Sequence, residues 1–318
     1  MSTDVPVLKK TMRAVFYDSF GGPEVIRYEE VAVPQPGKGE ILVEVHAAGV
    51  NPVDWKIRGG YRRENFTLPL IPGWDFSGVV AAKGTEADDF EIGDEVYSRP
   101  DINRHGAYAE YIVVRQSEVA RKPESLDHIA AAAVPLACLT AWQSLFDAAD
   151  LQEGQKVLIH AAAGGVGHFA VQLAKYKNAY VIGTASKEHN DFVRQLGADE
   201  VIDYKATKFE KEVKDVDVVF DTIGGETQRR SWKVLKKGGI QVTILKPPSK
   251  AEAEEHGARV GYVFVQPNRE QLTEIAKLID DGVIKPAVEA VFPLSEAAEA
   301  QELSQAGHTA GKIVLQVI

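Results

Sequence analysis

The residues with the clearest chemical potential lie in a glycine-rich turn that follows a short apolar run. Residues 157–159 have the composition of a strand buried on both faces. Starting from Val166, apolar residues then recur at i, i+3, i+4, i+7 and i+8, which is typical of one helix face. Between strand and helix stand Gly164, Gly165 and Gly167. In such a unit the first free helix amides point at a ligand, and small residues let a pyrophosphate approach the backbone. The turn therefore predicts an anion site, although Ala162 occupies the first position of the dinucleotide pattern Gly-x-Gly-x-x-Gly.

The stretch after the second predicted strand indicates which dinucleotide would bind. An NAD site places Asp or Glu about 20 residues after the glycine turn, where the carboxylate accepts a hydrogen bond from the ribose 2′-hydroxyl. Here Ser186 and Lys187 stand at that place, and no acid occurs before Glu188. A carboxylate would repel a 2′-phosphate carrying about −1.5 to −2 charges, whereas a hydroxyl and an ammonium favour it. Lys187 alone could be a solvated surface lysine, but together with the missing acid it indicates NADPH.

The chain reads as two successive regions of secondary structure, and these must position the residues above. Residues 12–126 are β-rich, with strand candidates at 13–17, 25–29, 41–46, 75–81 and 109–114. After a helical stretch, strands are expected at 157–160, 180–183, 200–202, 216–220, 240–245 and 262–265, with helices at 167–177, 188–196 and 227–235. This alternation predicts a parallel, doubly wound α/β sheet. The tail adds a helix at 269–281, a strand at 289–292, a helix at 295–306 and a strand at 312–318.

Composition excludes several classes of protein. A length of 318 residues suggests two domains, and 45% hydrophobic with 26% charged residues is ordinary for a soluble protein. The net charge of −10 argues against nucleic acid or an anionic membrane as a partner. The N-terminus lacks a cationic start followed by an apolar stretch, so no secretory signal is expected. The single cysteine, Cys138, cannot form an internal disulfide, and we expect a cytoplasmic protein.

Further motifs occur in order along almost the whole chain. They are Gly49-Val-Asn-Pro-Val-Asp54 with Gly60-Tyr61, Gly106-Ala-Tyr-Ala-Glu110, Pro135-Leu-Ala-Cys-Leu-Thr-Ala141, Ala161-Ala-Ala-Gly-Gly-Val-Gly167, Gly197-Ala-Asp199 and Gly311-Lys-Ile-Val314. This series resembles the zinc-independent medium-chain dehydrogenases/reductases of the quinone oxidoreductase (zeta-crystallin-like) branch. The resemblance implies a GroES-like β-rich catalytic domain over 1–130, a Rossmann NADPH-binding domain over 131–267, and a return to the catalytic domain over 268–318. It also implies a cofactor cleft between the domains and a homodimer or homotetramer.

The resemblance supplies further cofactor contacts. Tyr204 would be a third ligand of the 2′-phosphate, and Thr140 would approach the pyrophosphate or the nicotinamide ribose. Phe264 and Val265 would line the nicotinamide pocket. Lys312 would reach a phosphate, although an arginine frequent in the family just before this motif is absent. The remaining contacts follow strand ends, at Thr222, Ile223 and Leu245.

The same comparison argues against a metal. The alcohol dehydrogenases of this superfamily hold a catalytic zinc with a cysteine and a histidine–glutamate pair, and here Asn51 and Trp74-Asp75 stand at those places. One cysteine cannot supply the four thiolates of a structural zinc site. We therefore expect no bound metal.

Without a metal, the easiest substrates are quinones, enones and enals, because hydride addition to a conjugated system gives a delocalised enolate. By resemblance, Asn51 lies near the nicotinamide and the substrate oxygen, and Tyr61 supplies a hydrogen bond or a proton unless it is only a packed loop aromatic. Trp74 walls the substrate pocket or packs beneath the turn, and Tyr108 is a further pocket candidate. The sequence thus predicts an NADPH-dependent reductase of quinones or α,β-unsaturated carbonyls. A 2-enoyl-thioester reductase and a non-catalytic NADPH-binding regulatory or structural protein are the alternatives.

Overall fold

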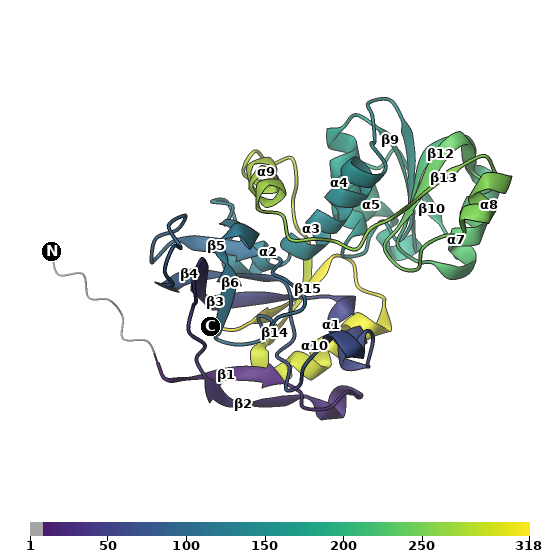
Figure 1. Cartoon of the computed structure of the whole chain (residues 1–318). Coiled ribbons are helices and arrows are strands. Elements are labelled where there is room, and N and C mark those ends of the chain that lie inside the picture. The colour runs from purple at the N-terminus through teal and green to yellow at the C-terminus, as the bar shows by residue number, and fades with distance from the viewer. Residues whose placement is uncertain (1–8) are drawn as a thin grey trace. The chain divides into compact units, whose positions relative to one another are not determined.

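The computed structural model describes residues 9–318 (Figure 1). The N-terminal residues 1–8, which carry most of the stretch that bears on a secretory signal, lie outside the described residues. The chain divides into two compact units. Unit 1 contains the chain up to Leu136, Gln266–Asp280 and Val288–Ile318, and unit 2 contains Ala137–Val265 and Asp281–Ala287. These limits differ from the expected domain boundaries at 131 and 268, since unit 2 begins at Ala137 and takes in a segment of the tail.

Unit 1 is built on a seven-stranded sheet with the order β14-β15-β3-β4-β5-β7, and β6 pairs with β3. A separate antiparallel pair joins β1 and β2. The strands are β1 Thr11–Phe16, β2 Arg27–Ala32, β3 Glu40–Val50, β4 Phe76–Lys83, β5 Glu95–Ser98, β6 Tyr111–Arg115, β7 Val119–Arg121, β14 Val288–Pro293 and β15 Lys312–Gln316. The helices are α1 Pro52–Arg58, α2 His128–Ala132, α9 Arg269–Asp280 and α10 Ala297–Ala306. The short strands β5 and β7 were not predicted, because neither carries enough apolar alternation to stand out.

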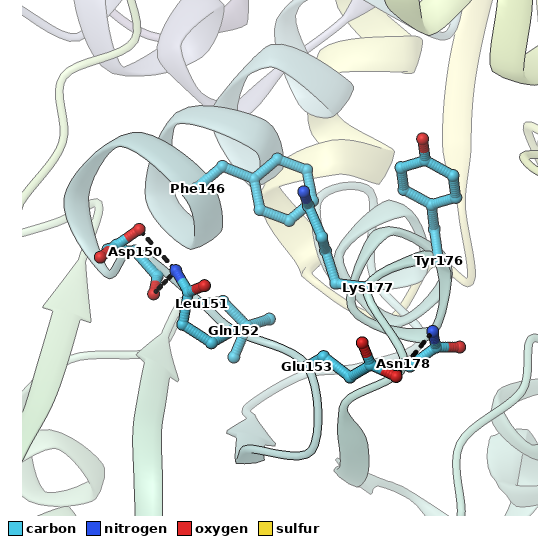
Figure 2. Close-up of a pocket in the computed structure, with 8 residues that line it drawn as sticks. All are labelled: Phe146, Asp150, Leu151, Gln152, Glu153, Tyr176, Lys177 and Asn178. Atoms are coloured by element: carbon cyan, nitrogen blue, oxygen red, sulfur yellow. Dashed lines mark hydrogen bonds between the residues drawn. The ribbon is translucent and has the colours of Figure 1, made fainter.

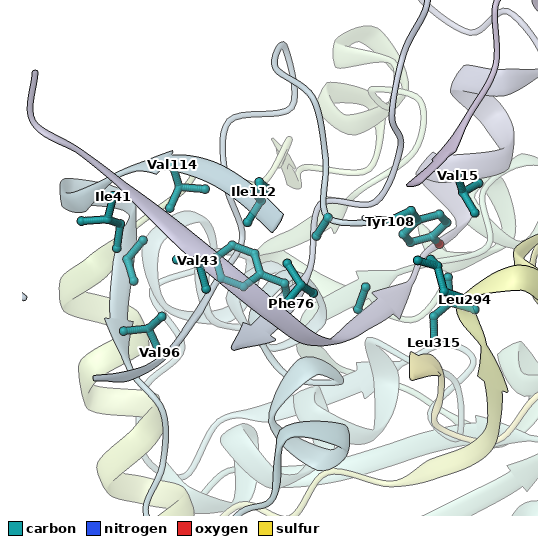
Figure 3. Packing of buried hydrophobic residues seen from close by; sticks show 14 of the residues in the cluster. Val15, Ile41, Val43, Phe76, Val96, Tyr108, Ile112, Val114, Leu294 and Leu315 are labelled. Carbon is teal, nitrogen blue, oxygen red and sulfur yellow. The ribbon is translucent and has the colours of Figure 1, made fainter. Parts of the chain in front are cut away.

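The core of unit 1 joins residues from both ends of the chain. Strand β15 runs antiparallel to β3, with Ile313 opposite Val50. Val15, Phe76 and Tyr108 pack in one hydrophobic cluster with Leu294 and Leu315 (Figure 3). The C-terminal strand is therefore an interior strand of this sheet and completes its core.

Unit 2 contains a six-stranded sheet in which all pairs are parallel, with the order β10-β9-β8-β11-β12-β13. Strand order reverses between β8 and β11, which confirms the predicted doubly wound α/β fold. The strands are β8 Lys156–Ile159, β9 Tyr180–Ala185, β10 Glu200–Asp203, β11 Val216–Asp221, β12 Leu235–Thr243 and β13 Arg259–Tyr262. The helices are α3 Pro135–Trp142, which starts within unit 1, α4 Gly167–Tyr176, α5 Asn190–Gln195, α6 Phe209–Glu212, α7 Gly225–Ser231 and α8 Lys250–Glu255. A π-helical turn covers Gln143–Ala148.

Several predicted elements of the chain have other bounds in the structure. The strand expected at 262–265 ends at Tyr262, so Phe264 and Val265 follow it. The helix expected at 227–235 ends at Ser231, and Leu235 already belongs to β12. The strand expected at 25–29 begins at Arg27, because a 3-10 turn occupies Pro23–Val25. Proline at the first position of that turn fixes the backbone in a helical φ.

Helix α9 illustrates how apolar spacing fixes an element. Leu272, Ile275 and Ile279 are buried on one face, and the Asn268 side chain accepts a hydrogen bond from the Gln271 amide at 2.9 Å. With 12 residues, α9 is far shorter than a bilayer span. No helix among residues 9–318 is long and apolar enough to cross a membrane.

Candidate functional site

The glycine turn of unit 2 has the geometry of an anion site. It lies between the end of β8 and the start of α4, and Gly164 N donates to Ala161 O at 2.9 Å. A Cβ atom at Gly167 would stand 2.1 Å from Ala161 O, so only glycine allows this close packing of turn and helix. No side chain caps the N-terminus of α4. The His168 amide donates to Gly164 O at 3.0 Å, but with no capping side chain the backbone amides ahead of it face an open helix end, which fits a pyrophosphate.

The three predicted 2′-phosphate ligands come together at the ends of two neighbouring strands. Strands β9 and β10 pair in parallel with Ala185 opposite Asp203, and Tyr204 N donates to Ala185 O at 3.2 Å. Ser186 and Lys187 follow β9 directly, and Tyr204 follows β10. Ser186 is buried, whereas Lys187 and Tyr204 are exposed. Among residues 9–318, the Lys187 ammonium has no hydrogen-bond or ion-pair partner, so it is available to a phosphate.

The sequence did not predict an ion pair that lies beside these three residues. Lys205 Nζ lies 3.2 Å from Glu188 Oε1, and both side chains are more than half exposed, at 57% and 56%. Hydrogen bonds from the backbone of Glu188, from Ser186 and from Lys205 lower the pKa of the Glu188 carboxyl to about 2. Position could have revealed Lys205, because it directly follows Tyr204 at the end of the strand beside β9.

Other predicted cofactor residues lie at the same carboxyl edge of the sheet. Thr222 Oγ1 donates to the carbonyl of His160 at 2.8 Å, and Ile223 is 51% exposed. Leu245 N donates to Thr243 Oγ1 at 3.3 Å, just beyond β12. Phe264 and Val265 are half-buried after β13. Thr140 is not in one of these loops, because it is buried on α3. Parallel strands place these loops at one edge, where open α/β sheets bind their ligands.

A buried carboxylate, which was not predicted, holds the loop after β11. Asp221 Oδ1 accepts from the amides of Ile223 and Gly224 at 3.0 and 2.8 Å. Asp221 Oδ2 accepts from Thr243 Oγ1 and Gln228 Nε2, both at 3.0 Å. All four contacts are local to unit 2, so the loop bearing Thr222 and Ile223 is fixed without a ligand.

In unit 1, Asn51 belongs to a buried polar cluster with Asp75 and Lys312, none of which is more than 3% exposed. Lys312 Nζ donates to Val50 O at 3.1 Å, to Asp75 Oδ2 at 3.3 Å and also to Asn51 Oδ1. Asn51 Nδ2 donates to Asp75 Oδ2 at 3.0 Å and to Gly49 O at 3.4 Å. A Cβ atom at Gly49 would stand 2.8 Å from Asp75 Oδ2, so glycine makes room for this carboxylate.

This cluster engages two residues that were predicted to contact ligands. Both amide hydrogens and the carbonyl oxygen of Asn51 are hydrogen-bonded within unit 1. Lys312 is buried with three oxygen partners. Pairing of this kind is required because a buried ammonium and a buried carboxylate must be compensated. Contact of Asn51 with a substrate and of Lys312 with a phosphate stay predictions.

Asp54, which belongs to α1, and Tyr108 extend the buried cluster. Asp54 Oδ2 accepts from Asn51 N and from the Tyr108 hydroxyl, both at 2.8 Å, whereas its Oδ1 has no partner among the described residues. Burial raises the pKa of the Asp54 carboxyl to about 7, with Asp75 adding to the effect and the two hydrogen bonds and Lys312 opposing it. Burial and the neighbouring Asp54 also raise the pKa of Tyr108.

The two predicted pocket residues have no exposed surface. Tyr108 and Trp74 are both 0% exposed, and Trp74 Nε1 donates to Arg104 O at 3.1 Å. They pack inside unit 1, as the alternative interpretation of Trp74 expects, and their role as pocket walls stays a prediction. Tyr61 differs from them, because its side chain is 44% exposed just after α1 and its amide donates to Lys56 O at 2.9 Å. Of the two predicted catalytic residues, only Tyr61 presents its side chain to solvent.

The residues that the resemblance sets at the zinc positions of alcohol dehydrogenases do not fit a metal ion. An amide, a carboxylate and a lysine ammonium meet there, and the ammonium already neutralises the carboxylate. Within residues 9–318, no three His, Cys, Asp or Glu side chains are grouped to hold an ion.

A separate pocket of about 390 Å³ lies in unit 2 (Figure 2). Its walls come from Phe146 and Asp150–Glu153, before β8, and from Tyr176–Asn178, before β9. It therefore opens at the amino edge of the parallel sheet, and none of the predicted cofactor residues lines it. Its polar groups bond one another, since Gln152 Nε2 donates to Asp150 Oδ1 at 2.7 Å.

Comparison with known proteins is consistent with this arrangement. Residues 37–124 match the family model for the alcohol dehydrogenase GroES-like domain, and residues 196–315 match the model for the zinc-binding dehydrogenase. The chain is 34% identical to the mitochondrial NAD(P)H oxidoreductase RTN4IP1 of Mus musculus, over 96% of this chain and 89% of that protein. It is 35% identical to the chloroplastic NADPH-dependent alkenal/one oxidoreductase of Arabidopsis thaliana, over 98% of this chain and 81% of that protein.

A solved structure gives the same result for the fold. The quinone oxidoreductase of Coxiella burnetii superposes with a TM-score of 0.91 at 37% identity, covering 97% of this chain and 100% of that one. The predicted combination of a GroES-like domain with a nucleotide-binding sheet is thus confirmed. The chain is accordingly an NAD(P)H oxidoreductase that belongs to the quinone oxidoreductase branch of the medium-chain dehydrogenase/reductase superfamily.

Proposed function

We propose that the protein is an NADPH-dependent reductase of quinones or α,β-unsaturated carbonyl compounds. The observation that carries the cofactor choice is the group of Ser186, Lys187 and Tyr204 at the ends of two adjacent strands, with an unpaired ammonium. A 2′-phosphate would be favoured there, and the hydroxyl of an NADH ribose would find no carboxylate in the usual position. The relative from Arabidopsis thaliana is named as an NADPH-dependent alkenal/one oxidoreductase, which supports this choice of cofactor and substrate class.

The residues suit a conjugated acceptor better than a simple ketone. Bound NADPH would supply a hydride. A conjugated substrate spreads the resulting negative charge over an enolate, so it needs an orienting surface and a proton donor more than a metal ion. In unit 1, the Asp75 carboxylate is paired with the Lys312 ammonium and accepts a hydrogen bond from Asn51. These three side chains are therefore not open to coordinate a metal ion. Tyr61 is the remaining predicted donor with an exposed hydroxyl-bearing side chain.

The test begins with kcat/KM for NADPH and NADH against a quinone, a short enone and a 2-enoyl thioester. We expect a preference for NADPH with the quinone or the enone. Turnover only with the thioester would favour the 2-enoyl-thioester reductase, and NADPH binding without any turnover would favour a regulatory or structural protein.

The variant Lys187→Asp tests the phosphate site directly. A hydrogen bond to a charged group is worth about 1.5–3 kcal/mol, so loss of one contact should lower the NADPH preference roughly 10- to 150-fold. An unchanged ratio of NADPH to NADH activity would remove Lys187 from the site.

Two further expectations belong to this proposal. The charge of −10 supports small-molecule partners rather than nucleic acid, and a single cysteine suits a reducing compartment such as the cytoplasm. A homodimer or homotetramer remains a prediction, which sedimentation velocity can check.

A further inference from the structure

The proposed 2′-phosphate site already contains a negative group of the protein itself. We propose that Glu188 and Lys205 form an exchangeable ion pair, in which the phosphate of NADPH replaces the Glu188 carboxylate and takes Lys205 as a second cationic ligand. Lys205 would then be a specificity-determining residue, and Glu188 a competitor for the same donors. This inference rests on the proposed NADPH dependence and extends it.

Backbone geometry brings the pair to the place where the phosphate would bind. The parallel register sets Asp203 opposite Ala185, so the residues that follow each strand are neighbours. Lys205 N donates to Asp203 Oδ1 at 2.9 Å and Ala206 N donates to Asp203 O at 3.2 Å, which turns the chain immediately after β10. Lys205 Nζ lies 6.0 Å from the centroid of the Tyr204 ring, beside another predicted phosphate ligand.

The Glu188 carboxylate uses the groups that a phosphate would need. It lies 3.2 Å from Lys205 Nζ, and after the hydrogen bond from its own backbone, Ser186 together with Lys205 contributes to lowering its pKa to about 2. Glu188 is therefore ionised at neutral pH. The Lys205 ammonium beside the proposed phosphate is thus paired with an anion until a ligand arrives.

Charge and exposure favour the exchange. Both partners are more than half exposed, and an exposed ion pair contributes little stability, so separating them costs little. A 2′-phosphate carries about −1.5 to −2 charges and three acceptor oxygens, so it is a stronger partner than one carboxylate for Ser186, Lys187 and Lys205. NADH lacks this phosphate, so the ion pair between Glu188 and Lys205 would stay intact when NADH binds.

The experiment measures dissociation constants of NADPH and NADH for the wild type, Lys205→Met and Glu188→Gln, by titration of intrinsic fluorescence. We expect Lys205→Met to weaken NADPH binding roughly 10-fold, because one charge-assisted contact is lost. Glu188→Gln should tighten NADPH binding several-fold, because the competing charge is removed. Neither change should move the NADH constant more than about twofold, since NADH has no phosphate to accept the exchange.

The matched control is Asp191→Asn on α5. Asp191 and Arg194 form another exposed ion pair of unit 2 at 3.0 Å, and its removal should leave both constants unchanged. Equal effects of Lys205→Met on NADPH and NADH, or weaker NADPH binding in Glu188→Gln, would overturn the exchange. If the wild type prefers NADPH and Lys187→Asp abolishes that preference while Lys205→Met has no effect, only this inference fails. If the wild type shows no preference, the proposed cofactor itself is wrong.

Discussion

Replacing Asp54 by asparagine should raise the free energy of unfolding at neutral pH, because ionisation of the buried Asp54 carboxyl destabilises the folded protein. The carboxyl is fully buried, its Oδ2 accepts two hydrogen bonds, and its Oδ1 has no partner among the described residues. An asparagine retains an oxygen that can accept both hydrogen bonds and cannot ionise. It therefore mimics the protonated form of Asp54.

The magnitude follows from the pKa of Asp54. Its value rises from 3.8 to about 7 on folding, mainly because of burial. At about 1.36 kcal/mol per pKa unit, ionising Asp54 in the folded state costs at most roughly 4 kcal/mol. Because the folded state binds a proton that the unfolded chain has released, the free energy of unfolding falls as pH rises from about 4 to about 7 and then levels off.

The assay is equilibrium urea unfolding at pH 5, 6, 7 and 8, followed by fluorescence. Two of the four tryptophans, Trp55 and Trp74, lie in unit 1 and report on its unfolding. We expect the free energy of unfolding of Asp54→Asn to rise relative to that of the wild type from pH 5 to about pH 7, with little further change at pH 8. Parallel pH profiles of the two proteins would refute the assignment of a raised pKa to Asp54.

Asp199 provides a control of opposite sign. Its pKa is lowered despite partial burial, through hydrogen bonds with the Val181 amide and Lys175. It therefore contributes stability that is present above its unfolded pKa and is lost as pH falls through the lower, folded value. Asp199→Asn should be less stable than the wild type at pH 5 to 8, with a difference that barely changes over this range.

Two other substitutions test unit 1. Lys312→Met should destabilise the protein by roughly 3–5 kcal/mol in urea unfolding, because it leaves the buried Asp75 carboxylate without its cation. The double variant Lys312→Met/Asp75→Asn should recover part of that loss, and additive losses would contradict the pairing. Tyr61→Phe should lower kcat with little change in NADPH affinity, and undiminished turnover would show that another group or solvent delivers the proton.

The sequence predicted the elements of unit 2 well because strand and helix alternate there with clear apolar spacing. Candidate cofactor residues could be proposed after β8, β9 and β10 because parallel strands bring their carboxyl ends to one edge of the sheet. Lys205 was missed because nothing in the local sequence gives its distance from Glu188. That distance depends on the register between β9 and β10, which only the folded sheet defines.

Unit 1 was harder to predict, for a different reason. Residue types at Asn51 and Tyr108 suggest contact with a substrate, but burial decides whether they can make one. Lys312 is separated from Asn51 by 261 residues in the chain, and the pairing of β15 with β3 brings them together. Long-range strand pairing of this kind leaves no local pattern in the sequence.

The interior position of the last strand has a consequence for synthesis on the ribosome. Most of unit 2 is continuous, from Ala137 to Val265, so its sheet can assemble while the tail is still being made. In unit 1, β3 lacks β15, and Asp75 lacks its counter-ion, until residues 312–316 have been translated. A nascent chain therefore carries an unpaired strand edge and an uncompensated carboxylate until this strand has been made.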